Sequence, residues 1–303
     1  MEKVIIIGAG PAGISAALYA VRGNLDPLVI NNGIGALEKA EKIENYYGLE
    51  HPLSGQELYD TGIAQAKALG VRILDAQVLG VGGFDTFVVK TTAGEFETQS
   101  LILATGSKRA APKIPGVKEF EGKGVSYCAI CDAFFYRGKD VAVLGNGDFA
   151  MHEAKELSNT ASTVTIYTNG EEPEFTPEEN ISVNTMKIQS VEGDDLVSGI
   201  RLEPDVQAEE IKAEAGQQAN DFCPAEGVFI AMGTAGSTEI ARQMGAELTE
   251  KGNIKVNENM ETTIPGLYAA GEVTGGLHGA GYMSGSGSVS YTHLRAHETE
   301  ADL

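Results

Sequence analysis

The chain has few basic residues, few cysteines and no long apolar segment, and each shortage excludes a class of function. Its 22 Lys and Arg stand against 43 Asp and Glu, which gives a formal net charge of −21 over 303 residues. Nucleic acids and acidic membrane surfaces repel such a polyanion, so neither is an expected partner. Three cysteines do not make a secreted disulfide framework, and no apolar run approaches the ~20 residues that span a bilayer. Met1-Glu2-Lys3 leads directly into the short apolar run Val4 to Ile7 instead of a secretory signal, so we expect a cytoplasmic protein.

What the chain does have is a glycine-rich turn that occurs twice. KVIIIGAGPAG (residues 3–13) and DVAVLGNGDFA (residues 140–150) each combine a short apolar strand, a Gly-x-Gly turn and a helical pattern. That order is typical of a βαβ unit with a phosphate site at the helix N-terminus. Two such motifs in this context predict an α/β protein with two doubly wound, Rossmann-like three-layer domains. Between them, residues 54–69 have helical spacing, and residues 87–89 and 95–98 suggest a hairpin.

Pro, Gly and Ser cluster where the chain is expected to pass between the domains. Pro112, Pro115 and Gly116 mark the first crossing, and the stretch from Thr234 to Ser237 marks the second. The run from Gly266 to Glu272 is a predicted strand that closes the first domain. We therefore expect one domain to be inserted in the other, with residues 1–115 plus 238–288 forming a discontinuous domain and residues 116–237 the inserted one.

In the first turn, GAGPAG, each glycine has its own expected role. Gly8 makes the tight turn, Gly10 lets the backbone approach a pyrophosphate, and Gly13 permits close packing of helix on strand. The helix from Ala12 directs free N–H groups and its positive dipole end at the phosphates. The ribose-binding acid expected about 20 residues later is replaced by Asn31-Asn32. An amide still binds a hydroxyl, but without charge assistance.

The stretch SYCAICDAFFY (residues 126–136) places Cys128 and Cys131 two residues apart. A structural zinc site needs four ligands, and only Cys223 and scattered histidines are available to complete one, so we expect no metal. A permanent disulfide is disfavoured by the cytosol and by the short loop. A reversible dithiol is the favoured interpretation. Asp132 adjoins the pair as a candidate general acid for the thiol proton, and a helix-capping carboxylate is its other interpretation.

Four stretches carry a family resemblance. PKIPGVKEFEGKGVSYCAICDAFFYRGKDVAVLG (residues 112–145), KIENYYG (42–48), LILATG (101–106) and IPGLYAAGEVTGG (264–276) resemble low-molecular-weight bacterial thioredoxin reductases and follow that family's order. The resemblance covers most of the chain up to about residue 276. It implies FAD as cofactor, a thioredoxin-like disulfide as substrate and a homodimer at full length. The FAD contacts that it implies, together with the glycine turn, are Gly8, Gly10, Ala12, Gly13, Asn45, Thr105, Gly106, Gly271 and Glu272.

Individual roles also follow from this resemblance. Cys131 is implied to be the flavin-facing thiol, and Cys128 is implied to attack the substrate disulfide. Asn45 would lie beside the flavin, and Glu272 would bind the ribityl chain in place of the family's usual Asp. The chain departs from the family at Ala36, where many members carry a Gln that touches the flavin.

The second turn, GNGDFA, keeps Gly145 and Gly147 and has Ala150 in the third place, which makes a possible or vestigial nucleotide site. NADPH-dependent members place arginines after the next strand, because a 2′-phosphate demands charge-assisted donors. Here TNGEEPEF (residues 168–175) has no Arg or Lys. Each missing charged hydrogen bond is worth about 1.5–3 kcal/mol, so NADPH is a poor candidate donor. The residues that would repel its 2′-phosphate are Glu171, Glu172 and Glu174.

Two donors other than NADPH remain. NADH lacks the 2′-phosphate, whereas reduced ferredoxin would need no nucleotide site. Clostridial ferredoxin-dependent flavin thioredoxin reductases are similar in lacking the arginines and around GIGALEKAEKIENYYG (residues 33–48), and we favour this pyridine-nucleotide-independent interpretation. An NAD(P)H-dependent thioredoxin reductase and a truncated or non-catalytic FAD-binding relative are the alternatives. His152 is expected at the helix surface. A local docking patch for ferredoxin would use Lys39, Lys42, Lys108, Arg109 and Lys113.

The last part of the chain departs from the family. TGGLHGAGYMSGSG (residues 274–287), which contains His278, stands where the family begins a flavin-covering helix. From about Val289, VSYTHLRAHETEADL abandons the preceding pattern and resembles the translated read-through of a sequencing adapter. A genuine His-rich metal tail is the alternative. We expect residues 289–303 to be an artefactual tail.

Overall fold

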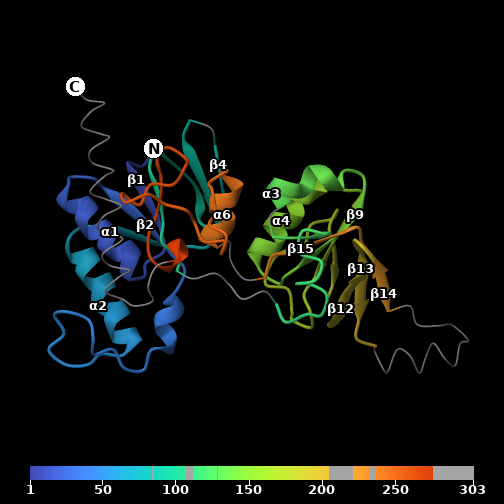
Figure 1. Ribbon diagram of the computed structural model, residues 1–303, viewed down its shortest axis with the longest axis horizontal. Helices are drawn as coiled ribbons and strands as arrows, with labels where there is room; N and C mark the ends of the chain where they lie inside the picture. Colours follow the sequence, from blue (N-terminus) through green and yellow to red (C-terminus); the bar gives the residue numbers. More distant parts are fainter. Residues whose placement is uncertain (84, 107–111, 128, 205–220, 233–235, 276–303) are drawn as a thin grey trace, which may run out of the picture. The chain divides into compact units, whose positions relative to one another are not determined.

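The computed structural model describes residues 1–83, 85–106, 112–127, 129–204, 221–232 and 236–275, and for Ile130 and Cys131 the backbone alone (Figure 1). Cys128, His278 and the expected tail from Val289 lie outside the described residues. The chain divides into two compact units. Unit 1 comprises residues 1–109 and 235–303, and unit 2 comprises residues 110–234.

Unit 1 is built on a parallel sheet with the strand order β16-β7-β1-β2-β3. The strand segments Val-Ile-Ile-Ile (residues 4–7) and Leu-Ile-Leu (residues 101–103) are buried along their whole length, as expected for a parallel sheet covered on both faces. Ile5 pairs with Leu28 on one side and with Leu101 on the other, which places β1 at the centre. The strands are β1 (Val4–Ile7), β2 (Pro27–Asn31), β3 (Arg72–Asp75), β7 (Leu101–Leu103) and β16 (Leu267–Ala269).

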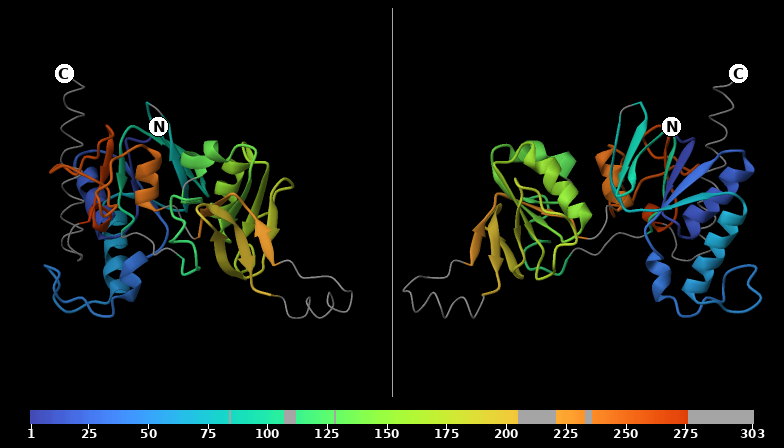
Figure 2. Two further views of the ribbon diagram at one scale, coloured as in Figure 1. Left: turned by 45° about the vertical axis from the view of Figure 1, so that its right-hand side comes forward. Right: turned by 180° about the vertical axis from the view of Figure 1, so that it is seen from behind.

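Helices α1 (Pro11–Arg22) and α2 (Gly55–Ala68) pack together on one side of this sheet, and a second, antiparallel sheet lies on the other side (Figure 2). Pro11 opens α1 at a position that needs no N–H. Ser54 and Glu57 form a reciprocal capping box at the start of α2. The remaining elements of unit 1 are η1 (Gly35–Lys39), β4 (Val78–Gly82), β5 (Phe87–Thr91), β6 (Gly94–Thr98), α6 (Ser237–Gln243) and η3 (Glu272–Thr274).

Unit 2 repeats this plan with the parallel strand order β11-β10-β9-β15-β8. Val143 of the central strand pairs with Ile166 on one side and Phe229 on the other, and all three are buried. The strands are β8 (Val125–Ser126), β9 (Asp140–Leu144), β10 (Thr163–Tyr167), β11 (Ser182–Asn184) and β15 (Gly227–Ile230).

The two faces of this second sheet are covered differently. Helices α3 (Ala129–Asp132) and α4 (Asp148–Ser158) lie on one face. The short helix η2 (Ala133–Tyr136) follows α3. An antiparallel sheet of β12 (Ile188–Gly193), β13 (Val197–Leu202) and β14 (Phe222–Pro224) lies on the other face (Figure 2). Its Val191, Ile200 and Leu202 share a core with Leu144 and Val228 of the parallel sheet.

The expected α/β fold with two Rossmann-like units is therefore confirmed. Each unit has a parallel sheet with the topological switch that places ligands at the carboxyl ends of its strands. Among the described residues, no helix combines the length and apolar character needed to cross a membrane.

Candidate active site

The first glycine turn connects β1 to α1 through three differently packed glycines. A Cβ on Gly8 would lie 2.4 Å from the carbonyl oxygen of Ala104, and one on Gly13 would lie 1.8 Å from that of Gly8. These two positions therefore exclude any side chain. Gly10 is different, because a Cβ there would meet nothing within 4 Å. The turn is thus rigidly packed on the protein side and open at the residue from which the helix starts.

The start of α1 also suits an anion. Gly10 provides no side-chain cap, Pro11 follows, and the first turn contains no acidic residue. Its free N–H groups and the positive end of the helix dipole are consequently not neutralised by the described side chains. Ala12 and Gly13 are buried, so the backbone rather than any side chain faces the open space.

The carboxyl ends of β7 and β16 lie beside this turn. The Ala270 N–H donates to Leu103 (2.9 Å), which holds Gly271 and Glu272 next to Thr105 and Gly106 at the same edge of the sheet. Gly106 and Gly271 have positive φ values of 83° and 85°, which glycine adopts without strain. Glu272 is half-buried at the start of η3.

Thr105 also fastens the two sequence segments of unit 1 to each other. Its hydroxyl lies 2.7 Å from that of Ser237, and the Ser237 N–H donates to the Thr105 hydroxyl (3.1 Å). The predicted cofactor residue therefore anchors the N-terminus of α6 at the point where the chain returns to unit 1. Ser237 is buried and was not predicted from the sequence.

At the end of β2, the Asn31 amide, which replaces the expected ribose-binding acid, already makes two hydrogen bonds. Asn31 donates through Nδ2 to Oδ1 of Asp75 (2.7 Å) and accepts from the Tyr59 hydroxyl at Oδ1 (2.9 Å). Burial raises the pKa of Tyr59, so its hydroxyl remains a donor. Asp75, at the end of β3 and exposed, holds a carboxylate at the place where the sequence pattern lacks one.

Among the described residues, no hydrogen bond links Asn45 or Ala36 to these strand ends. Ala36 lies in η1, and Asn45 is exposed on the loop between η1 and α2. This loop is tied to itself by the pairing of Ile43 with Leu53. Gly8, Gly10, Gly13, Thr105 and Gly271 are thus brought to one edge, whereas Asn45 is not.

The residues at this edge fit a dinucleotide such as FAD. An open backbone position, an uncapped helix N-terminus and glycine turns at three neighbouring strand ends form a cradle with space for a pyrophosphate. Hydroxyl-binding groups, Asp75 and Glu272, stand at strand ends on either side. FAD, once bound there, supplies two-electron redox chemistry that no protein side chain offers.

The second glycine turn, in unit 2, has the same backbone form with a different surrounding charge. A Cβ on Gly145 would lie 2.3 Å from the Ala231 carbonyl oxygen, and one on Gly147 would meet nothing within 4 Å. Ala150 is fully buried against Gly145. The first turn of α4 carries Asp148, whose negative charge opposes an anion at this helix N-terminus.

An acidic loop closes over this second turn. The Glu174 N–H donates to the carbonyl of Asn146 (2.7 Å), inside the glycine turn itself. The loop is folded locally, because the Thr168 hydroxyl donates to the Glu171 carbonyl. Glu171, Glu172 and Glu174 are all exposed. Lys187, which the sequence pattern did not indicate, places its side-chain stem beside Gly170 of this loop.

Helix α3 begins directly after Cys128 and includes Cys131. The Ser126 hydroxyl, at the end of β8, donates to Oδ2 of Asp132 (2.6 Å), and Asp132 is half-buried. Within the described part of the chain, Asp132 makes no capping hydrogen bond to η2, although it occupies the N-cap position. Its carboxylate is therefore held by a side chain on the strand beside the cysteine pair.

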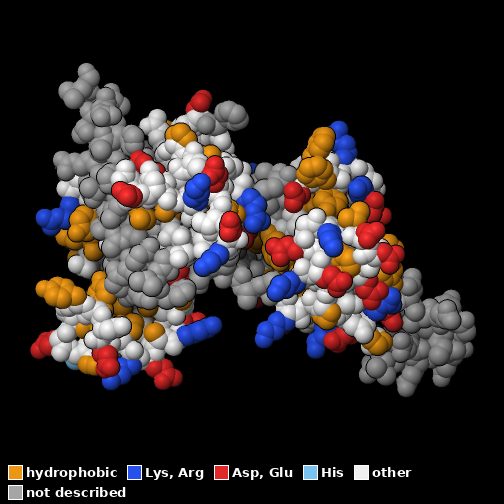
Figure 3. All heavy atoms as spheres, viewed as in Figure 1, with side chains coloured by type: hydrophobic (Ala, Val, Ile, Leu, Met, Phe, Trp, Pro, Cys, Tyr) orange, Lys and Arg blue, Asp and Glu red, His pale blue; other side chains and the backbone are white. Residues whose placement is uncertain are grey.

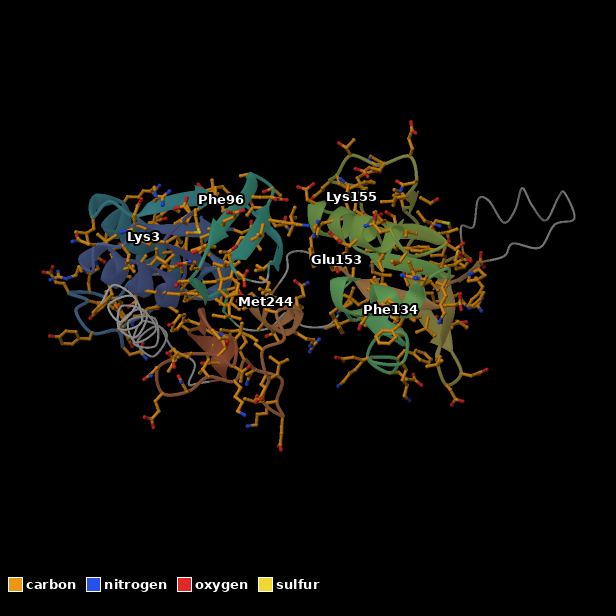
Figure 4. The ribbon with its side chains drawn as sticks, turned by 90° about the horizontal axis from the view of Figure 1, so that it is seen from above. Lys3, Phe96, Phe134, Glu153, Lys155 and Met244 are labelled. Carbon is orange, nitrogen blue, oxygen red and sulfur yellow. The ribbon has the colours of Figure 1, made fainter. Side chains whose placement is uncertain are left out.

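Beyond α3 the chain presents two exposed aromatic rings. Phe134 and Phe135 are 71% and 68% exposed and pack edge to face at 6.2 Å. Arg137 lies over the Phe134 ring at 5.4 Å. Figure 4 shows the Phe134 ring projecting from this part of unit 2. Exposed aromatic pairs of this kind are uncommon on a surface that binds nothing.

Helix α4 corrects one expectation and adds a residue. His152 is half-buried instead of exposed at the helix surface, since its side chain is only 11% exposed, and it lies 4.0 Å from Glu156. Glu153 is buried and its Oε2 accepts the Ala129 N–H (2.6 Å), within α3. The sequence pattern did not single out Glu153, because a glutamate on an amphipathic helix is ordinarily solvent-exposed.

Known proteins resemble the chain in sequence and in structure. The family model described as "Pyridine nucleotide-disulphide oxidoreductase" matches residues 2–292. The thioredoxin reductase of Aquifex aeolicus is 37% identical over 285 residues, 89% of this chain and 84% of that protein. The atypical thioredoxin reductase TRi from Desulfovibrio vulgaris Hildenborough has 36% identity and a TM-score of 0.87 over 99% of both chains. A ferredoxin-flavin thioredoxin reductase from Clostridium acetobutylicum has 27% identity and a TM-score of 0.68 over 98% of both.

These matches extend over both units, and the FAD expected from the glycine turn is the cofactor of the family. The chain belongs to the pyridine nucleotide-disulphide oxidoreductases and, within them, to the thioredoxin reductase family of FAD-dependent, disulfide-reducing enzymes.

Proposed function

We propose that this enzyme passes electrons from FAD to the Cys128/Cys131 pair and on to the disulfide of thioredoxin or a thioredoxin-like protein, and that its electron donor is not NADPH. The observation that carries the second part is the hydrogen bond from the Glu174 N–H to Asn146. It holds an acidic loop against the glycine turn that would receive a nucleotide. We assign residues 1–115 plus 238–288 to the FAD-binding domain and residues 116–237 to the domain with the cysteine pair.

The cysteine chemistry is a pair of thiol–disulfide exchanges. The Cys128 thiolate attacks one sulfur of the substrate disulfide, so that a mixed disulfide forms and one substrate thiolate leaves. The Cys131 thiolate then attacks Cys128, which closes the pair and releases the second substrate thiolate. Two electrons thus move from the pair to the substrate, and each departing thiolate takes up a proton. Asp132, held by Ser126 beside α3, is placed to supply one of these protons.

The exposed aromatic pair supports a protein substrate. Phe134 and Phe135 follow the cysteine pair by only a few residues and present apolar rings to solvent. A small protein whose disulfide is surrounded by apolar residues would bury these rings on docking. Arg137, already positioned over Phe134, adds a cation at the rim of the same surface.

Substitution of single cysteines tests the assignment. We expect Cys128→Ser and Cys131→Ser each to abolish reduction of thioredoxin while FAD stays bound. Cys223→Ser is the matched control, because Cys223 is partly buried on β14 and packs against the core of unit 2. The assignment is wrong if either of the first two variants keeps turnover, or if Cys223→Ser removes it.

Reduced ferredoxin is the donor that we favour. The Clostridium acetobutylicum relative is a ferredoxin-flavin thioredoxin reductase by name. The present chain has no Arg or Lys in residues 168–175, directly after β10. Acidic and basic side chains are interspersed over the surface drawn in Figure 3. Five cations are candidates for docking. Lys42 pairs with Glu44 (2.6 Å), and Lys39 and Lys113 are exposed. Lys108 and Arg109 lie outside the described residues.

A pyridine-nucleotide-dependent reductase is the second candidate, favoured by one observation. Lys187 packs its stem on Gly170 and is exposed, so one cation stands near the acidic loop. A single lysine offers a point charge rather than the bidentate fork of an arginine. NADH, which has no 2′-phosphate, is the nucleotide more compatible with this loop.

Anaerobic flavin reduction distinguishes these donors. Equal concentrations of NADPH, NADH and chemically reduced ferredoxin are added to the FAD-loaded protein, and loss of flavin absorbance is followed. We expect rapid bleaching by ferredoxin and slow or no bleaching by NADPH. Dithionite serves as the control that the flavin is reducible. Rapid bleaching by NADPH would show that the acidic loop does not exclude it, and the donor assignment would then be abandoned.

A further inference from the structure

Glu153 is a buried carboxyl group in direct contact with the helix that carries the cysteine pair. It lies on α4, which packs on α3, and is 1% exposed. Its Oε2 accepts the N–H of Ala129 at 2.6 Å. Ala129 directly follows Cys128 in the chain and precedes Cys131 by two residues. No other described carboxyl group is as deeply buried.

The two oxygens of this carboxyl group have different environments. Oε2 has the Ala129 N–H, whereas Oε1 is buried with no hydrogen-bond partner among the described residues. Burying an ionised carboxylate with a hydrogen bond to only one of its oxygens costs free energy, so the neutral, protonated form of Glu153 is favoured. Burial raises the pKa of Glu153 to about 7, opposed by the Ala129 hydrogen bond and assisted by the charge of Glu156. The group therefore changes charge near neutral pH.

The surrounding charged groups do not compensate Glu153. Within the described part of the chain, no Lys or Arg forms an ion pair with it. Lys155, two residues along α4, points away from α3 and pairs with Glu178 at 2.5 Å (Figure 4). The titratable groups on α4 itself and on the elements packed against it are Asp148, His152, Lys155 and Glu156 on α4, Cys131 and Asp132 on α3, Asp140 on β9 and Tyr167 on β10.

We propose that Glu153 is a positioning residue that sets the reduction potential of the Cys128/Cys131 pair and couples it to pH. Its carboxyl group anchors the first turn of α3, and its charge opposes the formation of a thiolate in the same helix. This proposal rests on the proposed function, since it requires the pair to be redox-active. It does not make Glu153 a proton donor to the substrate, a role assigned to Asp132.

The coupling follows from charge. When the pair is reduced by two electrons that the reduced flavin would supply, the S–S bond breaks and one thiol and one thiolate form, with one proton taken up. The new thiolate is expected close to Glu153, because Ala129, whose N–H binds Glu153, directly follows Cys128. A second negative charge there makes ionisation of Glu153 less favourable, so the fraction of Glu153 that is ionised takes up a proton when the pair is reduced. Near neutral pH, between one and two protons therefore accompany two electrons in the wild type, and one accompanies them when Glu153 cannot titrate.

Redox titration of the cysteine pair as a function of pH tests this inference. The FAD-loaded full chain is equilibrated with thiol–disulfide buffers of defined potential, and the reduced fraction is measured by thiol alkylation. In Glu153→Gln, which keeps an acceptor for the Ala129 N–H, we expect the pH dependence of the midpoint potential to fall toward half of the wild-type value just above about pH 7 and to match the wild type below about pH 6. Glu156→Gln, the same substitution on the same helix, is expected to keep the wild-type dependence.

The outcomes separate the two proposals. If the wild-type pair does not cycle at all, the proposed function fails and the inference fails with it. If the pair cycles and Glu153→Gln keeps the wild-type pH dependence, the function stands and the role of Glu153 is refuted. A measurement on the wild-type protein tests the inference even if the Glu153→Gln variant misfolds. NMR of protein labelled with carboxyl-¹³C glutamate should show one glutamate titrating near neutral pH with a midpoint that rises on reduction, and its absence overturns the inference.

Discussion

The two glycine turns have nearly the same backbone and opposite electrostatics. Gly8 and Gly145 each approach an alanine carbonyl, at 2.4 Å and 2.3 Å from the Cβ position, and Gly10 and Gly147 each face open space. The first turn of α1 has no acidic residue, whereas α4 begins with Asp148 and is joined by the loop of Glu171, Glu172 and Glu174. A glycine motif therefore specifies a cradle for a phosphate, and the side chains around it decide whether an anion is accepted.

The largest effect should come from placing the same charge in each cradle. Gly10→Glu puts a carboxylate where the FAD pyrophosphate is expected, and both positions have space for a side chain. We expect FAD affinity to fall at least about a thousandfold in Gly10→Glu, because repulsion replaces charge-assisted hydrogen bonds that are each worth about 1.5–3 kcal/mol. Gly147→Glu should keep wild-type FAD content. Flavin absorbance per protein after gel filtration measures this, and equal losses in both variants would contradict the assignment of FAD to unit 1.

The buried Glu153 gives unit 2 a pH-dependent stability near neutral pH, whereas no carboxyl group described in unit 1 is buried. Its folded pKa is raised from 4.5 to about 7. The folded state holds the proton longer than the unfolded state, so its stability is greatest below about pH 4.5 and declines as pH rises through about 7. Glu153→Gln removes this decline, worth on the order of 3 kcal/mol. Urea denaturation of both proteins at several pH values tests it, and parallel curves for the two would contradict the raised pKa.

The acidic loop offers a gain-of-function test of the difference between the turns. Glu171→Arg combined with Glu174→Arg supplies forked donors beside the second turn, and each charged hydrogen bond to a 2′-phosphate is worth about 1.5–3 kcal/mol in a protected site. Because both positions are exposed, we expect a smaller gain, about a tenfold lower half-saturating concentration of NADPH in flavin bleaching. Glu179→Arg, on the same exposed segment, is the control for net charge and should give no gain. A double variant no better than this control would show that the second turn is closed to nucleotides for a reason other than charge.

The sequence was informative where the signals are local and failed where partners are far apart. The glycine turns, the capped helix α2 and the returning strand β16 all follow from short patterns such as Ser54 with Glu57. The sheet of β12 to β14 has no such signature, because its apolar residues are buried in a core shared with residues distant in the chain, such as Val125, Leu144 and Val228.

The site shows the same division. Gly8 and Gly13 were placed correctly in the turn by their spacing, and their close contacts explain why only glycine is accommodated. The burial of Glu153 and the contact between Glu174 and Asn146 depend on elements that meet only in the folded chain. A carboxylate in a helical pattern looks the same in sequence whether it faces solvent or a neighbouring helix, so packing alone identifies Glu153.

The smallest predicted effect concerns the amide at the end of β2. Asn31 donates to Asp75 (2.7 Å), so the carboxylate missing from β2 is supplied 44 residues later by the adjacent strand. Introducing the acid that the motif usually has, Asn31→Asp, would place two carboxylates at hydrogen-bond distance, and we expect a loss of about 1–2 kcal/mol in stability at neutral pH. Asn31→Asp combined with Asp75→Asn exchanges the two groups, keeps the hydrogen bond and leaves the Tyr59 donor in place. Recovery in this double variant, measured by denaturation and by FAD affinity, would establish that one carboxylate is needed at this edge and that either strand is able to carry it. A double variant as unstable as Asn31→Asp would show instead that the position of the carboxylate on β3 is itself required.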